Sequence, residues 1–221
     1  MKKKIALLMA VVMLFGATVA GTLAWLKDTT DPVTNTFTVG DINISLEETW
    51  NTDSDDEGTE PDYWTAKMIP GSVYAKDPVV TVEPNSEKSY VFIEVKEANN
   101  EITVDGVKVD PIVMYEDNLV AGEGFTKYSE TTAEGVTTTV YVKVVDATTT
   151  TAVEFQILTD TYVADDALNG SVKINPDLTK KHIDALENLA ADKLPTLTFK
   201  AYAVQFENVA NEAAAWAIAN S

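Results

Sequence analysis

Short segments in which apolar and polar residues alternate recur along most of this 221-residue sequence, and polar turns separate them. Strict alternation puts every second side chain on one face, which is typical of a β-strand with one buried face. The clearest turn is Asp105-Gly106, and it predicts a hairpin over residues 102–109. Beyond this hairpin, the predicted strands are 36–46, 77–82, 90–96, 136–145, 153–158 and 197–206. Such a series of short strands predicts an antiparallel β-sandwich.

Three of the later segments carry more specific expectations. Val140, Val142 and Val144 alternate with polar residues or Tyr, and we expect these three side chains to face the core. The threonine tract 148–151 is expected to join their strand to the next one as a second hairpin. The strand 197–206 is apolar on both faces, which predicts a central, covered strand.

Two helices interrupt the predicted strands. Asn175 is a suitable N-cap for a helix over about 176–193, because Pro176 suits the first helical position. A second helix, rich in alanine, is predicted over about 211–220 with Trp216 as its anchor. The fold class is therefore all-β: a jelly-roll-like antiparallel β-sandwich over residues 41–221 as a single domain, with one helical insertion and a short C-terminal helix.

Residues 1–24 have the pattern of a helical signal peptide. Three lysines precede an unbroken apolar run over 5–15. Thr22 and Ala24 occupy the small-residue positions that precede a cut. Cleavage before Trp25 would release a secreted protein, destined for the extracellular matrix or the cell surface.

Two alternatives to this cut are open. A cut after Ala20 would use the small residues Thr18 and Ala20. An uncleaved membrane anchor is the second alternative, since apolar residues continue to Leu26. Cleavage before Trp25 is favoured because the second half of the apolar run is rich in Ala, Gly and Thr, which suits a peptidase better than a lipid-facing helix.

An N-terminal arm over residues 25–40 follows the signal peptide. The apolar residues of this region change phase at Gly40-Asp41, from odd to even positions. They are Phe37, Val39, Ile42, Ile44 and Leu46. A bulge at the phase change would bring all of them to one face, and we expect it to separate the arm from the strand that stays in the domain.

The charge of the chain excludes some classes of partner. The sequence contains no Cys and no Arg, and its formal charge is −19. Removing residues 1–24 lowers Lys from 16 to 13 against 35 acidic residues, which leaves a charge of −22. So acidic a protein is a poor partner for nucleic acid or for anionic membranes. Packing of many copies would be opposed by repulsion and helped by salt or acid.

The acidic stretch 50–64 contains a candidate calcium site. Asp53, Asp55, Asp56 and Glu57 are the oxygen ligands that Ca²⁺ prefers. Their spacing lacks the Gly at position six and the Glu at position twelve of the helix-loop-helix calcium site. A solvated surface loop is the favoured interpretation, and no cofactor is expected.

Residues for common hydrolytic mechanisms are scarce. His182 is the single histidine, it follows Lys180 and Lys181 on a predicted helix, and we expect it to be a surface residue. A zinc protease usually needs two histidines one helical turn apart, and a catalytic triad would need the same histidine. A glycosidase-type carboxylate pair is an open alternative, although no spacing singles one out. We therefore expect no enzyme activity.

The tryptophans allow a sugar-binding surface, but they are more often core anchors or covers of a sheet edge. Trp25 differs from the others, because a new N-terminal Trp has no partner that the sequence defines. The remaining three are Trp50, Trp64 and Trp216.

Several segments resemble a known family. The specific part is Gly-Thr-Leu-Ala-Trp-Leu-Lys-Asp (21–28) followed by Asn-Thr-Phe-Thr-Val-Gly-Asp-Ile-Asn-Ile-Ser-Leu (35–46). Residues 76–82 and 200–205, with the alanine-rich helix that follows them, resemble clostridial members. The family is the TasA/camelysin (CalY) group of Firmicute proteins, exported through a SipW-type signal peptidase.

This resemblance implies a secreted jelly-roll subunit of biofilm-matrix fibres. In TasA-like fibres the freed N-terminal arm of one subunit completes the sheet of the next. Carried over to this sequence, the donor residues would be Trp25, Val33, Phe37 and Val39. The implied partners are further copies of the chain in a homopolymer, the SipW-type signal peptidase during export, and, if the chain does not polymerise alone, a co-secreted anchoring protein.

We therefore expect a secreted structural protein that forms extracellular biofilm-matrix or cell-surface fibres by N-terminal donor-strand complementation. A monomeric cell-surface adhesin or carbohydrate-binding module is the alternative. A camelysin-like protease is the third interpretation, because camelysin-like proteins have been described as metalloproteases.

Overall fold

The computed structural model describes residues 41–48, 67–162 and 170–221. The chain divides into two units, 1–39 and 40–221, and the description concerns the second. The predicted signal peptide with Thr22 and Ala24, and the arm with its four donor residues, lie outside the described residues. So do the candidate calcium ligands at positions 53, 55, 56 and 57. Within the described ranges, no helix has the length and apolar character needed to cross a membrane.

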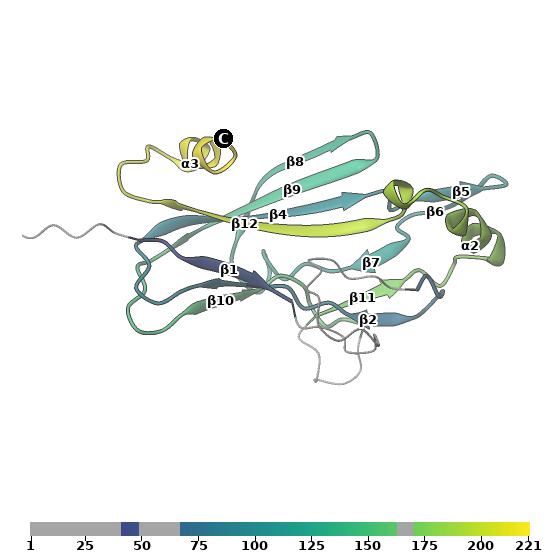
Figure 1. Ribbon diagram of the computed structural model, residues 1–221, viewed down its shortest axis with the longest axis horizontal. Coiled ribbons are helices and arrows are strands. Elements are labelled where there is room, and N and C mark those ends of the chain that lie inside the picture. The colour runs from purple at the N-terminus through teal and green to yellow at the C-terminus, as the bar shows by residue number, and fades with distance from the viewer. Residues whose placement is uncertain (1–40, 49–66, 163–169) are drawn as a thin grey trace, which may run out of the picture. The chain divides into compact units, whose positions relative to one another are not determined.

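The described chain forms an antiparallel β-sandwich. Its first layer is a four-stranded sheet in the order β12-β4-β9-β8 (Figure 1). These strands are β12 (Thr196–Gln205), β4 (Ser89–Ala98), β9 (Val136–Val145) and β8 (Thr126–Ala133). The ten residues of β4 pair along their whole length with both β12 and β9, so β4 is a central strand of this layer.

Two three-stranded sheets make the second layer, in the orders β1-β3-β10 and β2-β11-β7. The first sheet contains β1 (Ile44–Glu47), β3 (Val79–Val82) and β10 (Val153–Gln156), and the second contains β2 (Val73–Ala75), β11 (Ser171–Ile174) and β7 (Val113–Tyr115). A bridge between Asp117 and Leu158 links them. Connections β3–β4, β9–β10 and β11–β12 each pass from one layer to the other, as expected for a jelly-roll-like sandwich.

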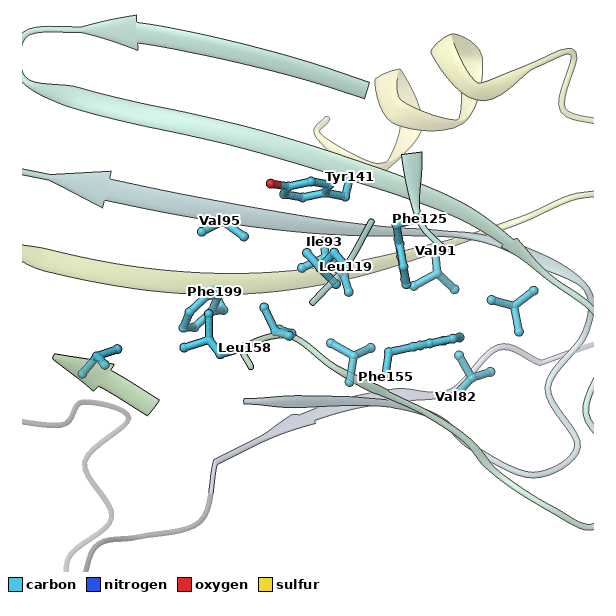
Figure 2. Packing of buried hydrophobic residues seen from close by; sticks show 14 residues of the cluster. Val82, Val91, Ile93, Val95, Leu119, Phe125, Tyr141, Phe155, Leu158 and Phe199 are labelled. Atoms are coloured by element: carbon cyan, nitrogen blue, oxygen red, sulfur yellow. The ribbon is translucent and has the colours of Figure 1, made fainter. Parts of the chain in front are cut away.

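The main core lies between the two layers. Figure 2 shows Ile93 of β4, Tyr141 of β9 and Phe199 of β12 on the side opposite Phe155 and Leu158. Phe125 packs edge-on against Phe155, with ring centroids 5.1 Å apart. Aromatic rings and β-branched side chains fill the space between the two layers, as the alternating pattern predicted.

A second core covers the outer face of the four-stranded sheet. The helix α3 (Glu212–Ala219) lies over it, and the Asn211 side chain caps the helix by accepting from the Ala214 N–H at 3.0 Å. Trp216 lies 5.1 Å from the Phe92 ring and 5.4 Å from the Tyr202 ring. The predicted C-terminal helix and its anchor are therefore confirmed.

The prediction that the valines of β9 face the core is confirmed for Val140 and Val142 and wrong for Val144. Val140 and Val142 pack in the core under α3, and Val144 is 39% exposed. Tyr141 and Val145 face the main core instead. Both faces of this sheet are covered, so alternation alone does not identify the face that points to the other layer.

Two predictions of strand pairing were also wrong. The threonine tract does not close a hairpin, because β10 pairs with β3 in the other layer. The hairpin partner of β9 is β8, through Glu134-Gly135, whose φ angles are 52° and 77°. β12 is covered on both faces only in its second half, and it is the outer strand of its sheet, not a central one.

The helical insertion is shorter than the predicted 176–193. The helix α2 (Lys180–Glu187) begins after Thr179, and a single 3-10 turn, η1 (Ala191–Lys193), follows it. Asn175 makes a local turn, with Oδ1 accepting from the Asp177 N–H at 2.9 Å. The helix lies against the hairpin of β5 (Ile102–Val104) and β6 (Val107–Val109).

Candidate functional site

The start of β1 marks where the chain joins the sandwich. The Glu87 N–H donates to the Asp41 carbonyl, and the Glu83 N–H donates to the Asn43 carbonyl, both at 2.9 Å. Ser86 Oγ accepts from the Asn43 N–H at 3.2 Å and donates to the Glu83 carbonyl at 2.8 Å. Residues from Asp41 onward are thus held in the domain, on the downstream side of the predicted phase change.

β1 is an outer strand of its sheet and pairs with β3. Ile44 and Leu46 pack against the main core, as their spacing predicted. At the other end of β1, Glu48 pairs with Lys76, whose side chain is almost completely buried and lies 5.3 Å from the centre of the Phe199 ring. Contacts therefore hold β1 in the domain at both of its ends.

An assembly site for an extended arm needs a sheet edge whose backbone groups have no strand beside them. The outer strands in the described part of the chain are β12 and β8 in the first layer and β1, β10, β2 and β7 in the second. Their sequences and side-chain contacts distinguish them.

β8 is a poor edge for an added strand. A register shift between Lys127 and Ser129 breaks its regular spacing. Lys127 and Glu130 pair at 2.7 Å on the exposed surface. Bulges and charges of this kind are the usual protection of an edge against pairing.

Side chains occupy parts of two further edges. The Gln156 N–H of β10 donates to Glu123 Oε1 at 3.0 Å. On β7, the Asn100 side chain takes the place of a strand: it accepts from the Val113 N–H at 2.6 Å and donates to the Val113 carbonyl at 2.8 Å. Both strands are also short.

β12 presents the longest edge in the described residues. The Phe206 N–H donates to the Lys88 carbonyl at 2.9 Å, so even-numbered residues of β12 point their backbone groups toward β4. The backbone groups of Leu197, Phe199 and Ala201 therefore point away from β4. No described strand pairs with that side.

An acidic groove of about 520 Å³ runs beside β7. Its lining includes Glu97, Glu116 and Asp117 together with Tyr115. Tyr141 Oη donates to Asp117 Oδ2 at 2.9 Å. Burial first, and then the neighbouring carboxylates, raise the pKa of both tyrosines well above the ordinary value. The described residues contain no group of three side chains arranged to hold a metal ion.

His182 is a buried residue, so its prediction as a surface residue was wrong. It is 2% exposed, and its Nδ1 accepts from the Thr179 N–H at 3.1 Å. Nε2 then carries the proton and donates to the Val107 carbonyl at 3.2 Å. Nδ1 thus caps the start of α2, and Nε2 holds the helix against β6, a role that helical periodicity does not reveal.

Trp216 is placed as an anchor by its ring contacts, and Trp25, Trp50 and Trp64 lie outside the described residues. The chain matches no protein-family model, no curated protein and no solved structure.

Proposed function

We propose that this chain is a secreted structural protein that polymerises into extracellular fibres of the biofilm matrix or the cell surface. In this proposal the mature chain donates its N-terminal arm, residues 25–40, to the sheet of the next copy. It would belong with the TasA/camelysin proteins that its junction segment resembles.

Two features of the described chain support the proposal: β1, the edge strand that directly follows the arm, and the long edge of β12 that has no strand beside it. The arm immediately precedes Asp41, where the chain becomes fixed to the domain. β12 pairs with β4 along ten residues, and within the described chain no strand lies beside its other edge. Backbone hydrogen bonds from an added strand supply affinity, and its alternate side chains supply specificity.

The contact runs from the arm of one copy to a different surface of the next, so it propagates instead of closing into a dimer. The SipW-type signal peptidase would set the time of assembly, because the arm stays tethered until the cut before Trp25. A charge of −22 per mature chain predicts that salt promotes growth of the fibre. A co-secreted anchoring protein would attach the fibre to the cell.

The test is to export the full chain from a Gram-positive host that has a SipW-type peptidase and to examine the secreted protein by electron microscopy and light scattering. A variant lacking residues 25–35 is the matched control. We expect filaments with the arm and monomers without it. Mass spectrometry of the secreted N-terminus should find Trp25, or Gly21 for the alternative cut.

A secreted chain that keeps its arm and stays monomeric across salt and pH would contradict the proposal. If that monomer binds polysaccharide, the protein is an adhesin or a carbohydrate-binding module. Proteolysis by the purified protein would instead support the camelysin-like interpretation.

A further inference from the structure

We infer that the acceptor for the arm is the free edge of β12, over Thr196–Ala201, and that its occupant is the segment 33–39 of a second copy. This inference rests on the proposed function and adds the partner surface to it.

The two segments have the same alternating pattern. In β12, Thr196, Thr198 and Lys200 are exposed, while Leu197, Phe199 and Ala201 pack against the main core. The arm segment alternates in the same way, with threonine on one face and apolar residues on the other, interrupted once by Asn35. Its threonines are Thr34, Thr36 and Thr38, and its apolar residues are Val33, Phe37 and Val39.

Pairing of these segments would match the side chains on both faces of the extended sheet. Threonines would lie opposite threonines on the solvent side, a favourable cross-strand pair. On the core side, Phe37 and its neighbours would cover Leu197 and Ala201, which are only partly buried members of the main cluster. The outward backbone groups of β12 would gain partners along the same stretch.

The length of the arm fits the edge. Pro32 has no N–H to donate, so a paired segment that begins at Val33 starts where the ladder becomes possible. Seven residues of strand span about 23 Å. The six residues Thr196–Ala201 span about 20 Å.

Within one chain Thr36 cannot reach Thr198, so a contact between these two positions requires a second copy. Asp41 is bonded to Glu87, and Phe206 is bonded to the adjacent Lys88, so Asp41 lies at the Gln205 end of β12. Thr36 is five residues from Asp41 and reaches about 17 Å from it at most. Thr198 lies eight residues from Phe206, about 26 Å away along the strand.

The absence of cysteine makes this arrangement testable by disulfide capture. Full-length chains carrying T36C or T198C, with tags of different mass, are exported separately, mixed under conditions that give filaments, and oxidised. Matched controls replace T198C by T131C on the β8 edge or by E154C on the β10 edge; all three acceptor positions are exposed. Adjacent strands bring Cα atoms within the range that a disulfide spans.

We expect at least a tenfold higher yield of the mixed-tag dimer for T36C with T198C than for either control. Filaments with equal or greater capture at T131C or E154C, or with no capture at T198C, would overturn the β12 assignment and leave the proposed function standing. An absence of both filaments and capture would overturn the proposed function, and this inference with it.

Discussion

Glu48 and Lys76 form a carboxylate–ammonium pair, with Nζ 2.9 Å from Oε2, where β1 ends beside the segment that joins β2 to β3. The Lys76 side chain is 9% exposed and the Glu48 side chain is 34% exposed. Because the ammonium is buried, water does not replace the carboxylate, and loss of the carboxylate should lower the stability of the fold.

We expect E48Q to lower the free energy of unfolding by about 1–3 kcal/mol, since the substitution leaves a buried cation with one fewer anionic neighbour. Urea denaturation measures the change. D146N is the matched control, because the Lys88–Asp146 pair has the same 2.9 Å separation on the exposed surface. An equal, small effect of both substitutions would show that water screens Lys76 in solution.

Removal of the Trp216 ring should weaken the packing of the second core, between α3 and the outer face of the four-stranded sheet. The ring contacts Phe92 and Tyr202 of the sheet, and we expect W216A to cost about 2–4 kcal/mol of unfolding free energy. I218A is the control on the same helix, because Ile218 is 55% exposed and should matter little. Equal stability of W216A and the unaltered chain in urea would mean that α3 is not docked.

Substitution of His182 should detach α2 from the β5–β6 hairpin. H182A removes the acceptor for the Thr179 N–H and the donor to the Val107 carbonyl, and it leaves a cavity. We expect a loss of about 2–4 kcal/mol and faster amide exchange in 102–109 and 179–187. K180A on the exposed face of α2 should leave exchange unchanged. Unaltered exchange in H182A would refute the docking role.

Tyr115, which lines the acidic groove, and Tyr141, which is bonded to Asp117 of that groove, predict a loss of stability in alkali. The pKa of Tyr141 is raised in the folded state, so its contribution is fully present below the ordinary tyrosine pKa of about 10 and is lost as pH rises further. The unfolding free energy should fall above pH 10 by up to about 1.4 kcal/mol per pH unit for this residue. Tyr115 should add to the slope for the same reason.

Y141F removes the ionising group and keeps the ring, so it should flatten the decline of unfolding free energy between pH 10 and 11.5. Y128F is the comparison, because it removes a tyrosine hydroxyl from the second core, away from the groove. Identical slopes for Y141F and the unaltered chain would contradict the assignment of the alkaline loss to Tyr141.

Much of the fold was predictable from local pattern. The hairpin over 102–109 forms as expected, with positive φ at both Asp105 and Gly106. Val80 and Val82 share a buried face, and Trp216 anchors the last helix. In the hairpin, neighbours in sequence determine the geometry, and in the strand and the helix the spacing of apolar residues shows which side chains are buried.

Features that depend on distant partners were not predictable. The position of β12 in its sheet follows from pairing with β4, about a hundred residues earlier. The inward face of β9 was ambiguous because α3 covers the other face. Burial of His182 needs the Val107 carbonyl, which no helical pattern reveals. The edge that we assign as acceptor thus became visible only with the sheet order.

The link between Ser86 and Thr148 has a mechanical consequence. The Ser86 N–H donates to Thr148 Oγ1, and the Thr148 N–H donates to the Ser86 carbonyl, both at 2.9 Å. A tensile load applied at Asp41 along the axis of β1 therefore strains the β1–β3 ladder in shear and passes through this link into the β9–β10 connection. Force spectroscopy of T148A, which removes the Oγ1 that accepts from the Ser86 N–H, should find a lower rupture force than that of the unaltered chain. In the proposed fibre, tension on the arm would reach both layers, and the four-residue strand β1 would not bear it alone.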